Sequence, residues 1–159
     1  MNYKLFTGIA LAFVVGAGVS TVINMNVDEV TANLLTVQDG CDLSSSSCLA
    51  GDRLGHEVSV SLSPRPVPLL EDVAINVTVK GMDSLRVAQM SITGLNMYMG
   101  MQIIPLTLND VGNASEQKLT GILQLPVCTS RKMEWEATLV MQTEADMYRA
   151  VYSFTTVTP

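Results

Sequence analysis

The sequence predicts an all-β domain, an immunoglobulin-like antiparallel β-sandwich of seven to eight strands, preceded by one N-terminal transmembrane helix. Two observations predict the sandwich: apolar and polar residues alternate along a series of short segments after residue 57, and turn-forming residues separate these segments at short intervals. No segment after the first thirty residues shows the apolar period of an amphipathic helix. One uncharged apolar run near the N-terminus predicts the helix that crosses the membrane.

Residues 1–24 are expected to anchor the chain in a membrane. The run 5–23 contains no charged residue and nearly matches the about 20 apolar residues that a helix needs to cross the hydrocarbon core. A cleaved signal peptide has a shorter apolar region, roughly 7–15 residues, and a small-x-small cleavage site. The sequence offers only Gly16-Ala17-Gly18 as such a site. We therefore favour an uncleaved anchor, with a cleaved signal as the alternative.

The charges on either side of the run predict its orientation. Lys4 precedes it, whereas Asp28 and Glu29 follow it, so the N-terminus is expected to stay in the cytoplasm. The protein is then expected to be a single-pass protein of the bacterial cytoplasmic (inner) membrane with its domain in the periplasm. In this interpretation residues 25–33 form a tether and residues 34–159 form the periplasmic β-sandwich domain.

Seven segments carry the strand pattern, and glycine, proline or other turn residues bound them. In the first two, Val, Ile and Leu alternate with small or polar residues. The segment Pro64-Arg-Pro-Val-Pro68 separates these two and excludes a helix, because each proline biases the residue before it toward extended backbone. The predicted strands span 57–63, 73–80, 85–92, 103–108, 118–125, 133–143 and 147–156.

Cys41 and Cys48 are predicted to form a disulfide. A polar loop that includes four consecutive serines separates the two cysteines, and apolar residues flank the pair, as in a hairpin closed by a covalent bond. An oxidising compartment favours that bond. The alternative is a metal pair, but zinc-binding cysteines are usually about two to four residues apart, and no further cysteine or histidine lies near them in the sequence.

Two sulfur-rich stretches are the candidate metal site. The first reads Asn-Met-Tyr-Met-Gly-Met and offers the thioethers of Met97, Met99 and Met101 at every second position. The second reads Leu-Pro-Val-Cys-Thr-Ser-Arg-Lys-Met-Glu-Trp and offers the thiol of Cys128 and the thioether of Met133. An extended chain through the first stretch would point its three thioethers to one side. Because soft sulfur ligands select Cu(I), we expect the two stretches to meet and form a copper site.

A packed corner of the core is the alternative explanation. Trp135 is the only tryptophan, and its spacing from Met133 puts both side chains on one face of a strand, where thioether and indole make a favourable contact. Cys128 would then be an inert buried thiol. Against this, an unpaired cysteine in an oxidising compartment is a liability, and Cys128 lies in a polar loop. Trp135 is expected beside the metal site, where its fluorescence would report occupancy.

Four motifs of the chain resemble those of small, single-span periplasmic proteins of proteobacteria, which are similar to the YtkA-like and FixH-like domains. The motifs are Cys-x6-Cys, Pro-Arg-Pro-x-Pro, Asn-Met-x-Met-Gly, and Leu-Pro-Val-Cys followed by Met-x-Trp. The resemblance covers the chain after the anchor, and it implies an immunoglobulin-like fold and a role in copper handling or in the assembly of haem–copper oxidases. The metal ligands that it implies are Met97, Met99, Cys128 and Met133, whereas Met101 lies outside the motif and is an additional candidate.

The expected function is that of a membrane-tethered periplasmic Cu(I)-binding domain, a copper chaperone or haem–copper oxidase assembly factor with a copper donor or acceptor protein as its partner. The alternative is a non-metal, immunoglobulin-like interaction module of a membrane complex. The net charge of −6 argues against nucleic acid as a partner. An enzyme is not expected, because Cys128 has no resolving cysteine in motif spacing and His56, the only histidine, has no catalytic partner near it in the sequence.

Overall fold

The structure, a computed structural model, describes residues 32–82, 85–110 and 116–158. All of them belong to one unit of the chain, Thr31–Pro159. The predicted anchor, residues 1–24, and nearly all of the predicted tether lie outside the described residues. Within the part of the chain that the structure describes, no helix is long and apolar enough to cross a membrane.

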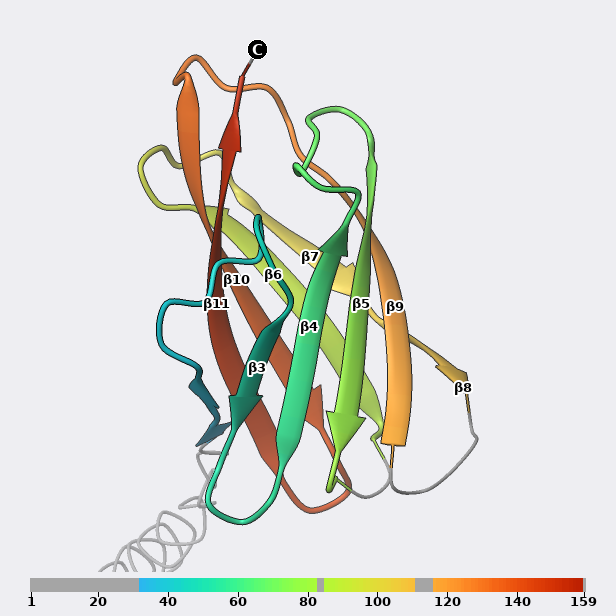
Figure 1. Cartoon of the computed structure of the whole chain (residues 1–159). Helices are drawn as coiled ribbons and strands as arrows, with labels where there is room; N and C mark the ends of the chain where they lie inside the picture. Colours follow the sequence, from blue (N-terminus) through green and yellow to red (C-terminus); the bar gives the residue numbers. More distant parts are fainter. Residues whose placement is uncertain (1–31, 83–84, 111–115, 159) are drawn as a thin grey trace, which may run out of the picture. The chain divides into compact units, whose positions relative to one another are not determined.

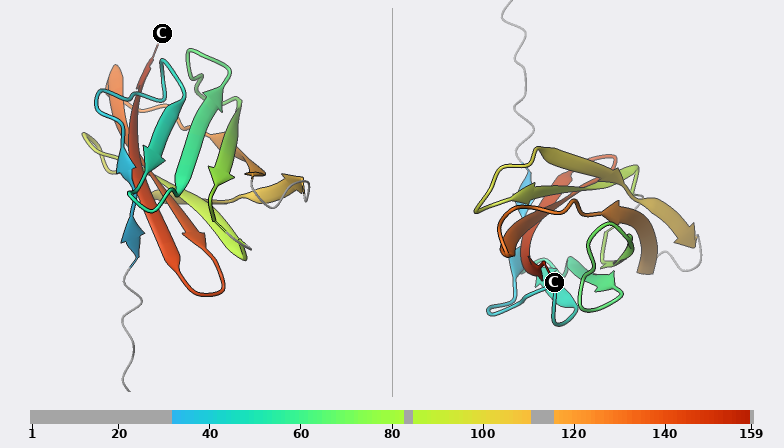
Figure 2. Two further views of the ribbon diagram at one scale, coloured as in Figure 1. Left: turned by 60° about the horizontal axis from the view of Figure 1, so that its bottom comes forward. Right: turned by 90° about the horizontal axis from the view of Figure 1, so that it is seen from above.

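The described residues form eleven strands in two sheets (Figure 1). The five-stranded sheet contains, in spatial order, β1 (Asn33–Leu34), β11 (Met147–Val157), β10 (Lys132–Gln142), β6 (Val87–Gly94) and β7 (Met101–Pro105). The six-stranded sheet contains β2 (Thr36–Val37), β3 (Cys48–Gly51), β4 (Glu57–Ser63), β5 (Asp72–Lys80), β9 (Glu116–Gln124) and β8 (Thr107–Asp110). Only β1 and β11 pair in parallel; all other described pairs are antiparallel. Seen from above in Figure 2, the sheets are the two layers of a sandwich.

The alternation in the sequence decides which side chains reach the core between the sheets. Every second residue of β10 from Met133 to Met141 is buried, and the same holds in β5 from Val73 to Val79. A strand points successive side chains to opposite faces, so this spacing places one whole face of each strand inside. The buried apolar side chains of both sheets belong to a single cluster. The predictions of an all-β fold and of a sandwich of antiparallel-rich sheets are confirmed.

The structure contains more strands than the seven to eight that the sequence predicts. The short strands β1, β2 and β3 lie within residues 33–51, where the sequence shows little alternation. The predicted strand 103–108 is divided, because β7 ends at Pro105 and β8 begins at Thr107 in the other sheet. Proline has no N–H to donate to a ladder and is confined to strand edges and ends. The other predicted strands agree with the observed ones apart from small shifts of their ends.

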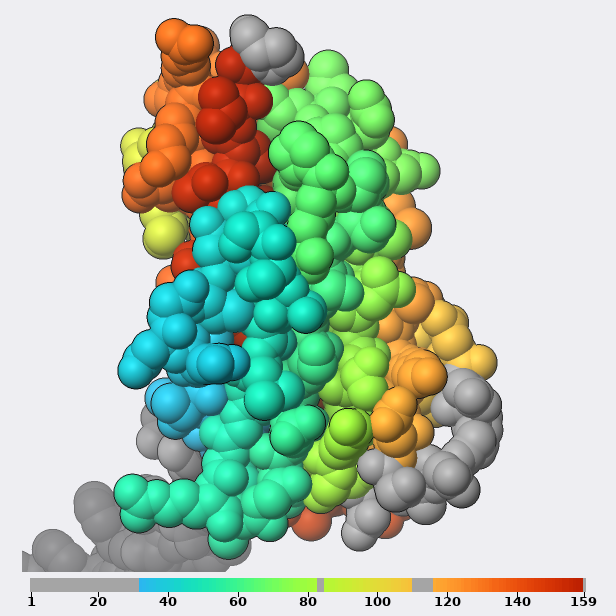
Figure 3. Space-filling view, in the orientation of Figure 1, coloured from blue at the N-terminus to red at the C-terminus, as the bar shows by residue number. Residues whose placement is uncertain are grey.

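A disulfide joins Cys41 to Cys48 at the start of β3, and the two Cα atoms are 5.7 Å apart. The loop that it closes lies beside β11, because the main-chain N–H of Leu43 donates a hydrogen bond to the carbonyl oxygen of Ser153 at 3.0 Å. Figure 3 shows this blue-to-cyan segment next to both the red end of β11 and the green β4. The predicted pairing of the two cysteines therefore fastens the N-terminal part of the domain to the rest of the sandwich.

The two ends of the sandwich carry different connections. The β10–β11 hairpin, the β3–β4 turn and the start of β1 lie at one end, where Asn33 is opposite Tyr148 (Figure 1). The connections between β6 and β7 and between β9 and β10 lie at the other end, near the C-terminus. Tyr148 lies at one end and Thr156 at the other, eight positions apart in β11. At the rise of an extended strand, about 3.4 Å per residue, the two ends are about 27 Å apart. The first strand, β1, therefore begins at the end far from the sulfur-rich stretches.

Candidate functional site

Hydrogen bonds bring the two sulfur-rich stretches together at the end of the sandwich that is uppermost in Figure 1. Nδ2 of Asn96 donates to the carbonyl oxygen of Lys132 at 2.9 Å, and Oδ1 of Asn96 accepts from the main-chain N–H of Glu134 at 3.1 Å. The main-chain N–H of Leu95 donates to the carbonyl oxygen of Glu134 at 2.8 Å. The β6–β7 connection is therefore held against the start of β10 beyond the end of the regular β6–β10 ladder.

Met97 follows Asn96 and directs its thioether toward the second stretch. The hydroxyl of Thr129 donates to Met97 Sδ, with 3.9 Å between the two atoms. Thr129 is the chain neighbour of Cys128, and Met97 packs against the core cluster that contains Cys128 and Met133. The side chain of Met97 therefore contacts Thr129 of the second stretch, and we refer to the sulfur-bearing residues Met97, Cys128 and Met133 as the sulfur cluster.

Gly94 provides the space in which this packing occurs. A Cβ atom at this position would lie 3.1 Å from Cε of Met133 and would collide with the carbonyl oxygen of Met97. Gly94 is also the last residue of β6 and is the register partner of Trp135 on β10. Only a residue without a side chain allows the backbone and Met133 to approach so closely here. No local pattern in the sequence distinguishes this glycine from the others.

The other members of the cluster lie in the core. Cys128 is the free cysteine of the described residues, and only 7% of its surface is exposed. Met133 and Trp135 lie on the inner face of β10, in agreement with their spacing. The indole Nε1 of Trp135 donates to Oγ1 of Thr156 at 2.9 Å, and its ring stacks on Phe154 with 6.2 Å between the ring centroids. Trp135 is one inward-facing position from Met133, so its fluorescence is well placed to report a change there.

The expectation that Met97, Met99 and Met101 point to the same side is wrong. The chain bends directly after β6 instead of staying extended, and Gly100 has a φ of 84°, which glycine adopts without strain. Met101 begins β7 opposite Thr93 on the outer face of the sheet, with 58% of its surface exposed. Met99 lies in the connection and is 36% exposed. Met101 therefore does not belong to the sulfur cluster, and Met99 is a surface residue of the connection that carries Met97.

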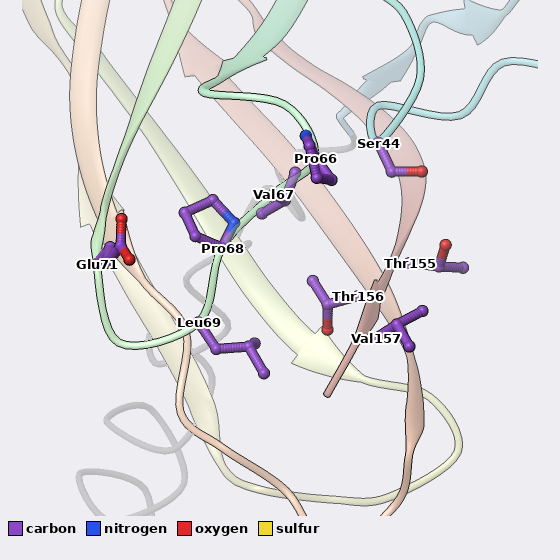
Figure 4. Close-up of a pocket in the computed structure, with 9 residues that line it drawn as sticks. All are labelled: Ser44, Pro66, Val67, Pro68, Leu69, Glu71, Thr155, Thr156 and Val157. Carbon is purple, nitrogen blue, oxygen red and sulfur yellow. The ribbon is translucent and has the colours of Figure 1, made fainter. Parts of the chain in front are cut away.

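A groove of about 500 Å³ lies next to this region, between the proline-rich loop and the end of β11 (Figure 4). Its lining residues are Ser44, Pro66, Val67, Pro68, Leu69, Glu71, Thr155, Thr156 and Val157. Thr156 connects the groove to the cluster, since it accepts the indole hydrogen bond and is the register partner of Met133. In Figure 4 the side chain of Leu69 points across the groove toward Thr156 and Val157. Glu71 is the only charged residue of this lining, so the groove is mainly apolar.

A polar cluster lies at the opposite end of the sandwich. His56 Nδ1 is 2.6 Å from Asp52 Oδ2, and His56 Nε2 is 3.4 Å from the hydroxyl oxygen of Tyr148. Asp52 Oδ1 also accepts hydrogen bonds from the main-chain N–H groups of Leu54, at 2.8 Å, and His56, at 3.1 Å. The rings of His56 and Tyr148 meet edge to face, with 4.8 Å between their centroids. These contacts join the β3–β4 turn of one sheet to β11 of the other.

The expectation that His56 has no partner is therefore wrong, and only Asp52 could have been suspected from the sequence. Desolvation raises the pKa of the Asp52 carboxyl, but hydrogen bonds from His56 and Leu54 outweigh it, so the net result is a lowered pKa. Burial raises the pKa of the Tyr148 phenol, and the charges of Asp146 and Asp52 raise it further. These pairs connect the two sheets, and a hollow of about 360 Å³ lies beside them, lined by His56, Gly81, Met82, Tyr148 and residues 143–146.

No group of three or more His, Cys, Asp or Glu side chains that could hold a metal ion occurs within the described ranges, and methionine thioethers do not fall in that class. Comparison of the chain with protein-family models, with curated proteins and with solved structures gave no match in any of the three.

Proposed function

We propose that this protein binds Cu(I) through the sulfur cluster of Met97, Cys128 and Met133. In this proposal it serves as a membrane-tethered periplasmic copper chaperone or haem–copper oxidase assembly factor, and its partner is a protein that donates or accepts copper. The observation that supports the proposal most directly is the pair of hydrogen bonds between Asn96 and the start of β10, because they bring the two sulfur-bearing stretches together.

The chemistry of the donor set fits Cu(I). Two thioethers and one thiol are soft ligands, which favour Cu(I) over magnesium, calcium and other hard cations. The thioether of Met97 has a hydroxyl as its polar neighbour, at 3.9 Å, and a thioether sulfur accepts hydrogen bonds only weakly. Little interaction energy is therefore lost when this sulfur turns to a metal. Cys128 would bind as the thiolate, so binding is expected to release its proton.

The cluster combines buried and accessible sulfur, as a site for copper transfer requires. Cys128 and Met133 are buried in the core, whereas Met97 is half-buried and Met99 is exposed. Met97 and Met99 lie on the connection between β6 and β7, and a loop can move aside more readily than a strand in the middle of a sheet. We assign Cys128 and Met133 to the retention of Cu(I), and Met97 and Met99 to its uptake and release.

The location of the cluster within the domain also supports transfer. β1 begins at the other end of the sandwich, so a partner can approach the cluster without meeting the start of the domain. A periplasmic location would account for the disulfide between Cys41 and Cys48, because that compartment is oxidising. The proposal includes a sandwich of the immunoglobulin type, a relation to the YtkA-like and FixH-like domains, and a membrane anchor in residues 1–24.

Competition for Cu(I) tests the proposal. The full chain, purified in detergent with ascorbate to keep copper reduced, is titrated against the coloured Cu(I) chelator bicinchoninate. One Cu(I) per chain is expected, together with a change in the fluorescence of Trp135 and a higher melting temperature, since a ligand that binds only the native state stabilises it. The double variant Cys128→Ser with Met97→Leu is expected to bind Cu(I) at least about 100-fold more weakly.

Two matched controls separate copper binding from general effects of removing sulfur. Met141→Leu removes a thioether from the core at a position outside the cluster, and Met101→Leu removes one from the outer face of the sheet. Both controls are expected to keep the stoichiometry and affinity of the parent. If the double variant binds one Cu(I) as tightly as the parent, or if Cu(I) leaves the melting temperature unchanged, the copper function is withdrawn and the non-metal interaction module takes its place.

A further inference from the structure

The hairpin formed by β6 and β7 carries no charge. From Val87 to Asn109 the sequence contains no Asp, Glu, Lys or Arg, although the whole chain has a net charge of −6. This stretch covers β6, the connection after it, β7 and most of β8. Two acidic copies of a protein repel each other through their charged surfaces. The β6–β7 hairpin is a surface at which a second copy would meet no opposing carboxylate.

β7 is an edge strand, with β6 as its neighbour in the five-stranded sheet. The main-chain N–H of Leu106 donates to the carbonyl oxygen of Ala88 at 2.9 Å, and hydrogen-bonded positions alternate along an antiparallel ladder. The even-numbered residues of β7 therefore direct their main-chain N–H and C=O groups toward β6. The main-chain N–H and C=O groups of the odd-numbered Met101 and Ile103 point away from β6. Among the described residues no main-chain group bonds to this outward edge.

Large apolar side chains are exposed on and next to β7, whose outward main-chain groups have no partner among the described residues. Met101 and Ile103 are 58% and 55% exposed on the outer face of β7, and Leu95 and Tyr98 are exposed in the connection before it. Edge strands are usually protected from pairing by charged residues, by proline or by a covering segment. β7 has no charged residue, and its proline, Pro105, stands only at its last position. An edge of this kind is a template for pairing with another strand.

We propose that β7 pairs with β7 of a second copy of this chain, antiparallel, about a two-fold axis at Gln102. In this register Met101 of each copy lies opposite Ile103 of the other, and each such pair exchanges both of its N–H···O bonds. An axis at Ile103 would instead set Met101 opposite Pro105, which has no N–H to donate. The position of Pro105 therefore selects the axis at Gln102.

A second copy suits this edge because the edge is complementary to itself. The exposed Met101 and Ile103 of the two copies cover one another across the axis, and the two five-stranded sheets become one continuous sheet. These side chains lie on the outer face of the sheet, whereas the sulfur cluster packs in the core. The dimer therefore does not depend on the copper proposal, and each can fail without the other.

Disulfide trapping in the full chain, purified in detergent, tests the register. Residues that are opposite but not hydrogen-bonded to each other have Cα atoms about 4.5 Å apart, and Gln102 faces its own copy at the axis. We expect Gln102→Cys, in a Cys128→Ser background that leaves no other free thiol, to form a covalent dimer on mild oxidation. The control is Ile122→Cys on the exposed face of β9, which is expected to remain monomeric over the same time.

Sedimentation equilibrium tests the interface without a new cysteine. Ile103→Lys places a lysine on each side of the axis and is expected to weaken dimerisation at least about tenfold, whereas Ile122→Lys is expected to leave it unchanged. Both positions are exposed, so both variants are expected to fold, and circular dichroism checks this. The proposal is overturned if Gln102→Cys is trapped no faster than Ile122→Cys, if the parent is monomeric at all concentrations, or if Ile103→Lys dimerises like the parent.

Discussion

The two ends of the sandwich are built alike, because each places side chains from distant parts of the chain against one another, but they use different atoms. At the polar end His56 lies 2.6 Å from Asp52 and 3.4 Å from Tyr148, so nitrogen and oxygen atoms are paired. At the other end thioethers and a thiol pack with the core, and the hydrogen bond from Thr129 to Met97 is a weak one of 3.9 Å.

This difference favours the sulfur end as the candidate site for a soft metal ion. The partly exposed side chains of Asp52 and His56 in the polar cluster are paired with each other, and His56 also contacts Tyr148 of the other sheet, so these interactions hold the sheets together. Sulfur atoms tolerate burial without strong hydrogen bonds, so their lone pairs stay available to a soft metal ion. Substitutions that alter one end at a time, or the core between the ends, test this difference.

The largest effect is expected from Gly94→Ala, which disturbs the sulfur end alone. The new Cβ would press on Cε of Met133 and on the backbone carbonyl of Met97. The free energy of unfolding, measured by urea denaturation, is expected to fall by about 2–3 kcal/mol, and the Cu(I) affinity to fall with it. The control Gly40→Ala meets no atom within 4 Å and has only the cost of its positive φ, about 1 kcal/mol. Equal losses in the two variants would contradict the role given to Gly94.

Thr156→Val is expected to have the next largest effect, because it removes the acceptor of the buried indole N–H of Trp135 and nearly preserves the side-chain shape. An unpaired buried donor costs about 1–3 kcal/mol, so the free energy of unfolding should fall by that amount in urea denaturation followed by Trp135 fluorescence. The control is Thr155→Val, on the other face of β11. If both variants are as stable as the parent, the hydrogen bond to the indole contributes nothing.

A substitution at Tyr152, in the core between the ends, is expected to raise the free energy of unfolding, whereas the two substitutions above lower it. Its hydroxyl is buried and has no hydrogen-bond partner among the described residues, and burial raises the pKa of the phenol above its ordinary value. Tyr152→Phe removes this unpaired group and is expected to raise the free energy of unfolding by about 1 kcal/mol. The control Tyr148→Phe loses the contact with His56 and is expected to lower the free energy of unfolding. A less stable Tyr152→Phe would mean that the hydroxyl has a partner in solution.

Asp52→Asn is expected to change the free energy of unfolding least and to leave the Cu(I) affinity unchanged. The folded-state pKa of Asp52 is below its ordinary 3.8, so its carboxylate contributes stability above about pH 3.8 that is lost as the pH falls through the folded pKa. Asparagine keeps an oxygen for the N–H of Leu54, so the loss at pH 7 is expected to stay below about 1 kcal/mol. Urea denaturation from pH 7 down to pH 2 should show the difference from the parent disappearing. A difference that grows in acid would contradict this account.

The long strands could be predicted from the sequence because their pattern is local. In β4, β5, β10 and β11 each residue's neighbours in the chain already show which side chains face the core. The two-residue strands β1 and β2 could not be predicted in the same way. They form only because β11 and β3 supply partners for their backbone groups, and those partners lie elsewhere in the chain.

The candidate site could be predicted only in part. The sulfur atoms were evident from the composition of two short stretches, and the inward position of Met133 followed from the period of a strand. Met101 was misplaced because the bend after β6 and the left-handed Gly100 put it on the outer face. The roles of Gly94 and Asn96 could not be predicted, because they are contacts to β10, about forty positions along the chain in both cases.

By itself the sequence determined which faces of the long strands are buried and that soft sulfur ligands are present, since strand period and atom type belong to the chain alone. Only the tertiary structure decided that Met97 packs against the core beside Thr129 while Met101 lies on the outer face of the sheet, and that His56 meets Tyr148. The physical reason is that these contacts depend on the register between distant strands and on how close two loops can approach, and neither is encoded by any single stretch of residues.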